Sequence, residues 1–485
     1  MTHPAGGKLG FRSVVMLGIN AIIGAGIFLT PGAVIKLAGP LAPLAYILAG
    51  LFAGTMAMVF ATAARYVTTN GASYAYTNAA FGRRLAIYVG VTHAVIASIA
   101  WGVLATLFVS TLLKVAFPQH DWSIDTDPFS IKTLTFLGFV AVLLVINLFG
   151  NRVIRWANGI STLGKVFALA VFIAGGVWII VTEHVNNYGA AGSSLVHHPQ
   201  PYALFGFIQI GQNNTPATLV LATMSALYAF TGFESIANAA EEMTEPNRNL
   251  PKAIPIVILA VGTIYVLAVA VAMLLGSDRI VASHDTVKLA AAIGDDTFRT
   301  VVVLGALVSM FGINVAASFG APRLWTALAD TGVLPTRLSK KNRFGVPMAA
   351  FAVTASLALA FPLALHFDND HLTGLAVIAR FIQFIIVPLA VMRLARNRAG
   401  TDPAITPTRF TRTVLPVAAV TISAALAVSF DYRTILLVPD GGPNYFSIAL
   451  VVTAFVVVPT AAYLYYFRSA DRSADRSARI GPAPH

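Results

Sequence analysis

Two short stretches of this chain could bind a polar solute within otherwise apolar surroundings. The first is Ile-Ile-Gly-Ala-Gly-Ile-Phe at residues 22–28, in an apolar run (13–38) that has no charged residue before Lys36. That run is long enough to cross a bilayer as a helix. Two glycines at its middle predict a break, since each costs about 1 kcal/mol relative to alanine in a helix. Non-helical backbone inside lipid is tolerated only where it is buried in protein or lines a cavity.

A second break is expected about 200 residues later, at Tyr-Ala-Phe-Thr-Gly-Phe-Glu (228–234) in the apolar run 215–242. Interrupted membrane helices at matching positions of two halves indicate a binding site at the interface of inverted repeats. The amides that begin a half-helix can bind a carboxylate, and unwound carbonyls can bind an ammonium. The alternative is that these glycines only allow close helix packing.

Four ionisable residues lie inside apolar runs, where a charge costs a few kcal/mol or more and therefore indicates function. Lys165 lies well inside the run 158–182, and Glu234 follows the second break directly. His93 and Arg380 are weaker candidates, because a lone membrane histidine is more often a satisfied core residue. The sequence offers no partner for Arg380.

The elements that must position these residues are membrane helices. The chain has 485 residues, of which 57% are hydrophobic and 11% charged, as in a polytopic membrane protein. We therefore predict an all-α membrane protein. Twelve spans are expected, at about 13–38, 42–64, 85–116, 132–150, 158–182, 215–242, 253–276, 299–329, 346–366, 372–395, 412–430 and 446–467.

The net charge of +12 indicates orientation in the membrane and not nucleic-acid binding. Lysine and arginine gather in alternate loops, at 8–12, 83–84, 152–155, 248–252, 337–343, 393–412 and 468–479. By the positive-inside rule both termini are cytoplasmic. The first apolar segment shows no cleavage pattern, so no signal peptide is expected, and the protein is expected in the cell membrane.

Several classes of function are not expected. Zero cysteines exclude thiolate metal sites and a disulfide-linked partner. No phosphate-binding loop, metal-ligand spacing or hydrolytic triad is present, so we predict neither an enzyme, nor a cofactor, nor a metal. No repeated pore motif of the kind that channels use is present either.

The motifs together resemble the amino acid–polyamine–organocation superfamily. Gly-Ala-Gly-Ile-Phe (24–28) resembles its first-span signature, and residues 229–234 with 241–251 resemble its sixth-span and following-loop signature. Residues 71–76, 323–324 and 332–335 also match. The resemblance implies a LeuT-type fold of two inverted five-helix repeats with helices 1 and 6 broken.

With this fold the chain divides into six segments. They are a cytoplasmic N-terminus (1–12), a first repeat (13–182), an extracellular loop (183–214), a second repeat (215–395), a region with the last two spans (396–467) and a disordered cytoplasmic tail (468–485).

The resemblance also implies a substrate site around both breaks. The substrate carboxylate is expected on the amides of Ala25 and Gly26, next to Gly24, although relatives often have serine where this chain has Ala25. The amino group is expected on the carbonyls of Ile22, Tyr228, Ala229 and Thr231. Tyr228 occupies the place of an aromatic gate, and His93 falls near a second gating position.

Lys165 resembles the fifth-span lysine of proton-coupled and exchanging members, whose ammonium takes the place of a sodium ion. Desolvation favours the neutral form of a buried lysine, which would let it release a proton. The alternative is a permanent charge bonded to first-span carbonyls. Glu234 resembles the acid of diamine antiporters, which lack this lysine. It could sense protons, face a cationic substrate, bind substrate directly or accept hydrogen bonds from nearby amides.

We therefore predict a secondary transporter of L-amino acids that works by alternating access, does not need sodium, and is proton-coupled or exchanging. Its expected partners are the amino acid, protons and membrane lipid. A cationic amino acid or diamine antiporter is the alternative.

Overall fold

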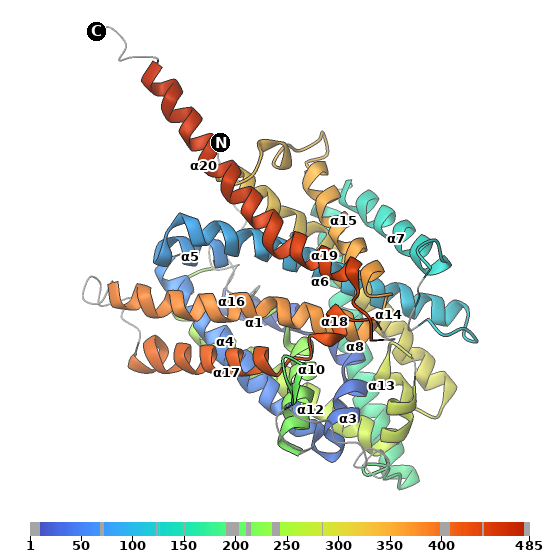
Figure 1. Ribbon diagram of the computed structural model, residues 1–485. Coiled ribbons are helices and arrows are strands. Elements are labelled where there is room, and N and C mark those ends of the chain that lie inside the picture. The colour runs from blue at the N-terminus through green and yellow to red at the C-terminus, as the bar shows by residue number, and fades with distance from the viewer. Residues whose placement is uncertain are drawn as a thin grey trace.

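The computed structural model describes residues 10–67, 72–122, 125, 127–148, 151–190, 203–209, 215–234, 243–283, 285–397, 408–438 and 441–479. These residues form almost entirely helices (Figure 1). One antiparallel hairpin pairs β1 (Ala203–Leu204) with β2 (Ile208–Gln209). The prediction of an all-α fold is confirmed.

The helices of the first half begin with a group that is interrupted near residue 24. They are α1 (Phe11–Ile22), α2 (Gly26–Leu29), α3 (Pro31–Ala38), η1 (Gly39–Leu41), α4 (Ala42–Tyr66), α5 (Ala72–Phe81), α6 (Arg83–Ala116), α7 (Ile131–Leu148) and α8 (Asn151–Glu183).

The second half begins with a short helix that ends at the second predicted break. Its helices are α10 (Thr215–Phe230), α12 (Pro246–Ala282), α13 (Lys288–Ala291), α14 (Asp296–Asp330), η3 (Thr336–Leu338), α15 (Met348–Ala364), α16 (Asn369–Asn397), the π-helical turn η4 (Phe410–Val414), α17 (Leu415–Ser429), α18 (Arg433–Leu436), α19 (Tyr445–Val452), the π-helical turn η5 (Thr453–Val457) and α20 (Val458–Arg479).

Among the described residues, ten helices are long and apolar enough to cross a membrane. Two shorter apolar helices, Thr218–Phe230 and Met348–Ala364, fall where the sixth and ninth spans are predicted. The sixth predicted span reaches residue 242, but α10 ends at Phe230, and residues 235–242 lie outside the described part. The number of true spans therefore stays a prediction.

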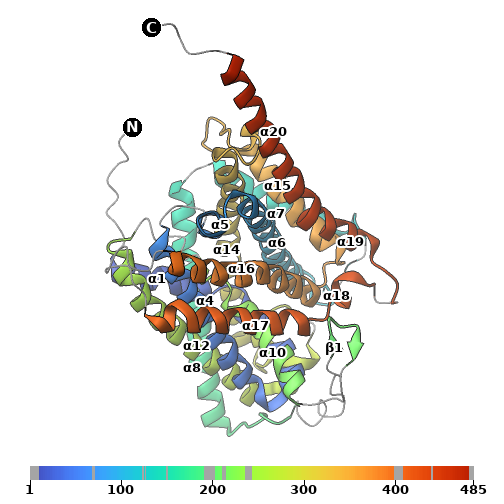
Figure 2. The same cartoon turned by 60° about the vertical axis from the view of Figure 1, so that its left-hand side comes forward.

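The interrupted helices lie within the bundle. The α1 helix packs against α12, and α10 packs against both α3 and α4. The long helix α14 packs against α8 and α6. In both views α16 and α17 run beside α4 (Figures 1 and 2). Both breaks are thus surrounded by other helices, which shield their unwound backbone.

The last helix differs from its prediction. Residues 468–479 are the end of α20, whereas the sequence predicts a disordered tail from residue 468. In both views α20 projects well beyond the other helices (Figure 2). Residues 458–479 include the repeated Ser-Ala-Asp-Arg, whose alanines and arginines are good helix formers, so the last span continues as one helix.

Candidate functional site

The first break consists of three residues between α1 and α2. Ile23 has extended backbone (φ −67°, ψ 99°) and ends α1, whereas Ala25 already has helical angles (φ −67°, ψ −23°) and caps α2. Ala25 and Gly26 therefore begin a half-helix that continues through α3. Amides in a first helical turn have no partner within their helix, so these two are available to an anion.

The second break follows α10 at Phe230. Thr231, Gly232 and Phe233 form a turn, in which Gly232 has φ +112°, a conformation that favours glycine. The carbonyl of Tyr228 accepts hydrogen bonds from the amide of Thr231 (3.2 Å) and from its hydroxyl (2.8 Å). A carbonyl oxygen has two lone pairs, so in this conformation the Tyr228 carbonyl is already saturated.

Glycines hold the two breaks against each other. A Cβ atom added to Gly26 would lie 2.6 Å from the Cα atom of Ala229, at the end of α10. A Cβ atom added to Gly232 would meet the carbonyl oxygen of Ala21, near the end of α1. Each broken helix thus contributes the glycine that lets the backbone of the other approach.

Tyr265 of α12 joins both breaks through its hydroxyl group. The hydroxyl lies 3.1 Å from the carbonyl oxygen of Ile22 and 3.1 Å from that of Ala229. The ring is fully buried and packs edge-on against Phe230, with ring centres 5.1 Å apart. Tyr265 is absent from the predicted site, because its only signal in the sequence is a tyrosine inside an otherwise apolar span.

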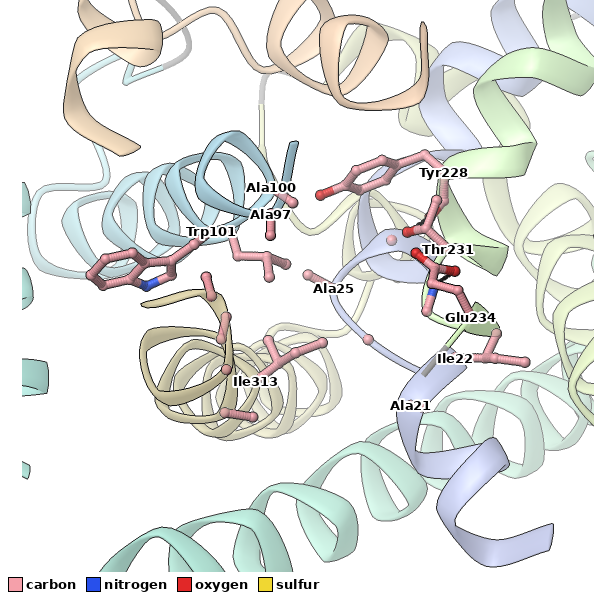
Figure 3. Close-up of a pocket in the computed structure, with 18 of the residues that line it drawn as sticks. Ala21, Ile22, Ala25, Ala97, Ala100, Trp101, Tyr228, Thr231, Glu234 and Ile313 are labelled. Atoms are coloured by element: carbon pink, nitrogen blue, oxygen red, sulfur yellow. Dashed lines mark hydrogen bonds between the residues drawn. The ribbon is translucent and has the colours of Figure 1, made fainter. Parts of the chain in front are cut away.

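A cavity of about 460 Å³ lies between the breaks, α6, α8, α14 and α16. All ten residues predicted for binding, coupling or gating line it: Ile22, Gly24, Ala25, Gly26, His93, Lys165, Tyr228, Ala229, Thr231 and Glu234. Figure 3 shows Tyr228, Thr231 and Glu234 on one side of this space, beside the unwound backbone at Ala25. Their roles stay predictions.

The opposite side of the cavity is made of small and aliphatic side chains and the ring of Trp101 (Figure 3). The indole nitrogen of Trp101 has no hydrogen-bond partner among the described residues. Ala97 and Ala100 of α6 face Ile313 of α14 there (Figure 3), and Ile96 and Ala316 extend this surface. The cavity therefore has one side of polar backbone groups and one largely apolar side, on which the Trp101 N–H is the polar exception.

Lys165 of α8 contacts the first break where α1 ends. Its ammonium donates hydrogen bonds to the carbonyls of Asn20 (2.8 Å) and Ile23 (2.7 Å), and the side chain is almost fully buried. One turn earlier in α8, the hydroxyl of Ser161 donates to the carbonyl of Ser309 in α14 (3.1 Å). The ammonium therefore satisfies carbonyls that α1 leaves without an amide partner where it ends.

Glu234 and Arg380 form an ion pair at the second break. The Nε atom of Arg380 lies 3.4 Å from one carboxylate oxygen of Glu234, and the amide of Gly232 donates to the other at 3.1 Å. The Arg380 guanidinium also donates to the carbonyl of Ala376 at 2.6 Å. This pair identifies the arginine's partner and connects the second break to α16.

Gln383 of α16 adds a polar group that is not among the predicted site residues. Its side chain is 3% exposed and lines the cavity. The oxygen accepts a hydrogen bond from the hydroxyl of Ser73 at 3.3 Å, but the amide nitrogen has no partner among the described residues. A buried donor without a partner costs about 1–3 kcal/mol, so this one is a candidate to bind a ligand in the cavity.

A cavity at two helix breaks within an apolar helical bundle is typical of membrane transporters. The model of the amino acid permease family matches residues 9–458, and the chain belongs to this family. The match confirms the resemblance to the amino acid–polyamine–organocation superfamily and indicates an integral membrane transporter, not an enzyme.

Named relatives agree with this family. An uncharacterized transporter of Mycobacterium tuberculosis is 69% identical over 469 residues, which cover 97% of each chain. The branched-chain amino acid permease of Bacillus subtilis is 26% identical and covers 81% of each chain. The L-asparagine permease of Streptomyces coelicolor is 23% identical, over 79% of this chain and 77% of its own.

Proposed function

We propose that the protein is a sodium-independent secondary transporter of neutral L-amino acids with apolar side chains. It works by alternating access around the two broken helices and is coupled to protons or to exchange. The observation that carries this proposal is the two-sided cavity, which offers backbone groups to a zwitterion and an apolar surface to its side chain.

The polar side suits the charged ends of an amino acid. The first-turn amides of Ala25 and Gly26 would bind the carboxylate, since a helix N-terminus stabilises negative charge. The ammonium would bind carbonyls at the helix ends. The Tyr228 carbonyl already accepts two hydrogen bonds, so it is the least suited of the four that the resemblance implies. The Tyr228 ring would then cover the substrate, as the resemblance implies.

The apolar side favours an uncharged side chain. Ala97, Ala100 and Ile313 offer no hydrogen-bonding side chain there, and burying a charged group against them would be costly. The printed name of the B. subtilis relative, a branched-chain amino acid permease, agrees with this size and polarity.

The contacts of Lys165 support independence from sodium. A tethered ammonium bonded to the carbonyls of Asn20 and Ile23 occupies the end of α1 and leaves no need for a free cation there. If this lysine also releases its proton during the cycle, transport is coupled to protons. If it stays charged, exchange is the remaining mode.

The ion pair of Glu234 argues against the alternative of a cationic amino acid or diamine antiporter. Glu234 is the one carboxylate among the described residues that line the cavity. Its charge is opposed by Arg380 at 3.4 Å, and a second cation would have to compete with that arginine. This environment fits better with a role for Glu234 in sensing protons or in stabilising the turn at the second break.

The number of membrane spans and their arrangement in repeats are part of the same proposal. We propose twelve spans, made of the ten long apolar helices and the two shorter ones, in two inverted five-helix repeats followed by two further spans. Both termini would be cytoplasmic, with the segment boundaries that the sequence predicts, except that residues 468–479 continue the last helix.

Uptake into liposomes tests the proposal. A thermal-shift screen of purified protein against all amino acids and several diamines selects the best ligand. Radiolabelled uptake of that ligand is then measured in sodium and in potassium buffers, with and without a pH gradient. We expect an apolar amino acid such as leucine to be taken up equally in both buffers.

Empty liposomes and liposomes with Gly26→Leu protein are the controls, because neither should accumulate ligand above background. Loss of uptake when potassium replaces sodium would overturn the assignment of Lys165. Binding and uptake of diamines or lysine, without neutral amino acids, would favour the antiporter.

A further inference from the structure

A second cavity lies on the outside of the bundle, away from the substrate site. It is a groove of about 820 Å³ between α4, α12 and the start of α17, within the range of about 300–1,000 Å³ usual for ligand pockets. These helices lie side by side in Figure 2. Leu51 and Leu259, which line the groove, are 64% and 72% exposed, so it opens toward the surroundings of the bundle.

The groove is apolar, because it is lined by glycines and by threonines whose hydroxyl groups are hydrogen-bonded within their own helices. Gly50, Gly54 and Gly262 line the groove and present no side chain to it. The hydroxyl groups of Thr55 and Thr263 donate to carbonyls of their own helices, at 2.9 Å and 2.8 Å. Because these hydroxyls are engaged, the groove suits a hydrocarbon chain and not a polar solute.

Positive charge gathers at the end of the groove where α12 and α17 begin. Lys252 lies two residues before Ile254, and Arg409 and Arg412 flank Phe410; both Ile254 and Phe410 line the groove. Lys252 and Arg409 are exposed, and Arg412 is half-buried. Among the described residues no salt bridge involves any of the three cations.

We propose that this groove is a binding site for one anionic phospholipid. An acyl chain lies along α4 and α12, and the headgroup phosphate lies between Lys252, Arg409 and Arg412. Basic residues beside a membrane helix attract anionic headgroups, and the apolar groove adds the specificity of shape that a general surface attraction lacks.

The bound lipid would lie directly behind the second break. The ring of Phe230, the last residue of α10, packs against Gly50, where an added Cβ atom would lie 3.2 Å from it. Phe230 also packs against Tyr265, which lies against both breaks. A lipid in the groove would therefore affect the packing of the broken helices, which must move during transport.

Native mass spectrometry of the full-length protein tests this site, with equal mole fractions of phosphatidylglycerol and phosphatidylcholine in mixed micelles. We expect one retained lipid with about a tenfold preference for phosphatidylglycerol. The triple variant Lys252→Ala, Arg409→Ala, Arg412→Ala should lose this preference. The matched control Arg337→Ala, Lys340→Ala, Lys341→Ala removes the same charge from the exposed loop after α14 and should keep it.

Filling the groove gives an independent measurement. Thr263→Phe and, separately, Thr55→Phe place a ring where the acyl chain would lie, and each should lose the retained lipid whatever its headgroup. Two results would overturn the proposal: equal retention of both lipids by the wild type, or the same loss of preference in the control triple variant. Unchanged retention in both phenylalanine variants, with normal thermal unfolding, would also refute it.

Discussion

Replacing Gly26 with alanine puts one methyl group between the two broken helices. The added carbon would lie 2.6 Å from the Cα atom of Ala229, and 3.2 Å from both the Ala229 nitrogen and the Tyr228 carbonyl oxygen. Non-bonded carbons pack at about 3.5–4.0 Å, so the helices must separate by about 1 Å. All three neighbours are backbone atoms, and none can rotate away.

The cost of this separation has two parts. Overpacking of a filled interior typically costs about 1–3 kcal/mol. Tyr265 lies 3.1 Å from carbonyls on both breaks, and moving the breaks apart stretches one of these contacts, which adds about 1 kcal/mol for a lost hydrogen bond. We therefore expect Gly26→Ala to lower the free energy of unfolding by about 2–4 kcal/mol and to weaken substrate binding.

Two other glycines of the same cavity provide graded controls. Gly320 has nothing within 4 Å of an added Cβ atom. At Gly24 the added atom would lie 2.8 Å from the movable end of Ile313 and at an ordinary 3.8 Å from the carbonyl oxygen of Ile22. We expect the unfolding temperature, and its increase on adding the best ligand, to be highest for Gly320→Ala, lower for Gly24→Ala and lowest for Gly26→Ala. If Gly26→Ala has the same unfolding temperature and ligand affinity as Gly320→Ala, the close contact of the breaks contributes neither to stability nor to binding.

Three further substitutions test the other parts of the site. Lys165→Ala leaves two helix-end carbonyls without a donor and should abolish uptake into liposomes, or leave exchange that no longer depends on pH; normal, pH-sensitive uptake would remove its coupling role. Tyr265→Phe keeps the ring packing but should lower the free energy of unfolding by about 1–3 kcal/mol in denaturant titrations, and equal stability would show that the hydroxyl does not hold the breaks. Glu234→Gln keeps an acceptor for the Gly232 amide but removes the charge that faces Arg380. Neutral amino acids should still bind in thermal-shift assays while the pH profile of uptake flattens, and selective loss of lysine or diamine binding would contradict this.

Much of the fold follows from hydrophobic runs alone. Spans such as 42–64 and 85–116 are predicted to within a few residues of α4 and α6, because a membrane helix needs a long apolar segment with few charges. The position of the first break can also be predicted, since two glycines at mid-span disfavour a continuous helix. The end of α20 cannot, because a polar helix beyond the membrane has no long apolar run to mark it.

The contacts within the site depend on neighbours that are distant in the sequence. Gly26 is predicted to belong to the site because of the amides that a carboxylate would approach, but its missing side chain faces Ala229, some 200 residues away. The partner of Arg380 is likewise 146 residues distant. Such pairs arise from how helices are arranged around one another, which the local pattern of one sequence does not contain.

A cation that is part of the chain cannot travel with the substrate. A sodium ion at the end of α1 would cross the membrane with each amino acid and carry a charge, whereas Lys165 stays attached to α8. If it keeps its proton, each zwitterion moves without net charge, and the membrane voltage neither drives nor opposes uptake. If it gives a proton to the receiving side, each cycle carries one charge, for which a voltage of 100 mV supplies about 2.3 kcal/mol. The electrical response of uptake in liposomes with an imposed potassium gradient therefore reports directly on what this one ammonium does.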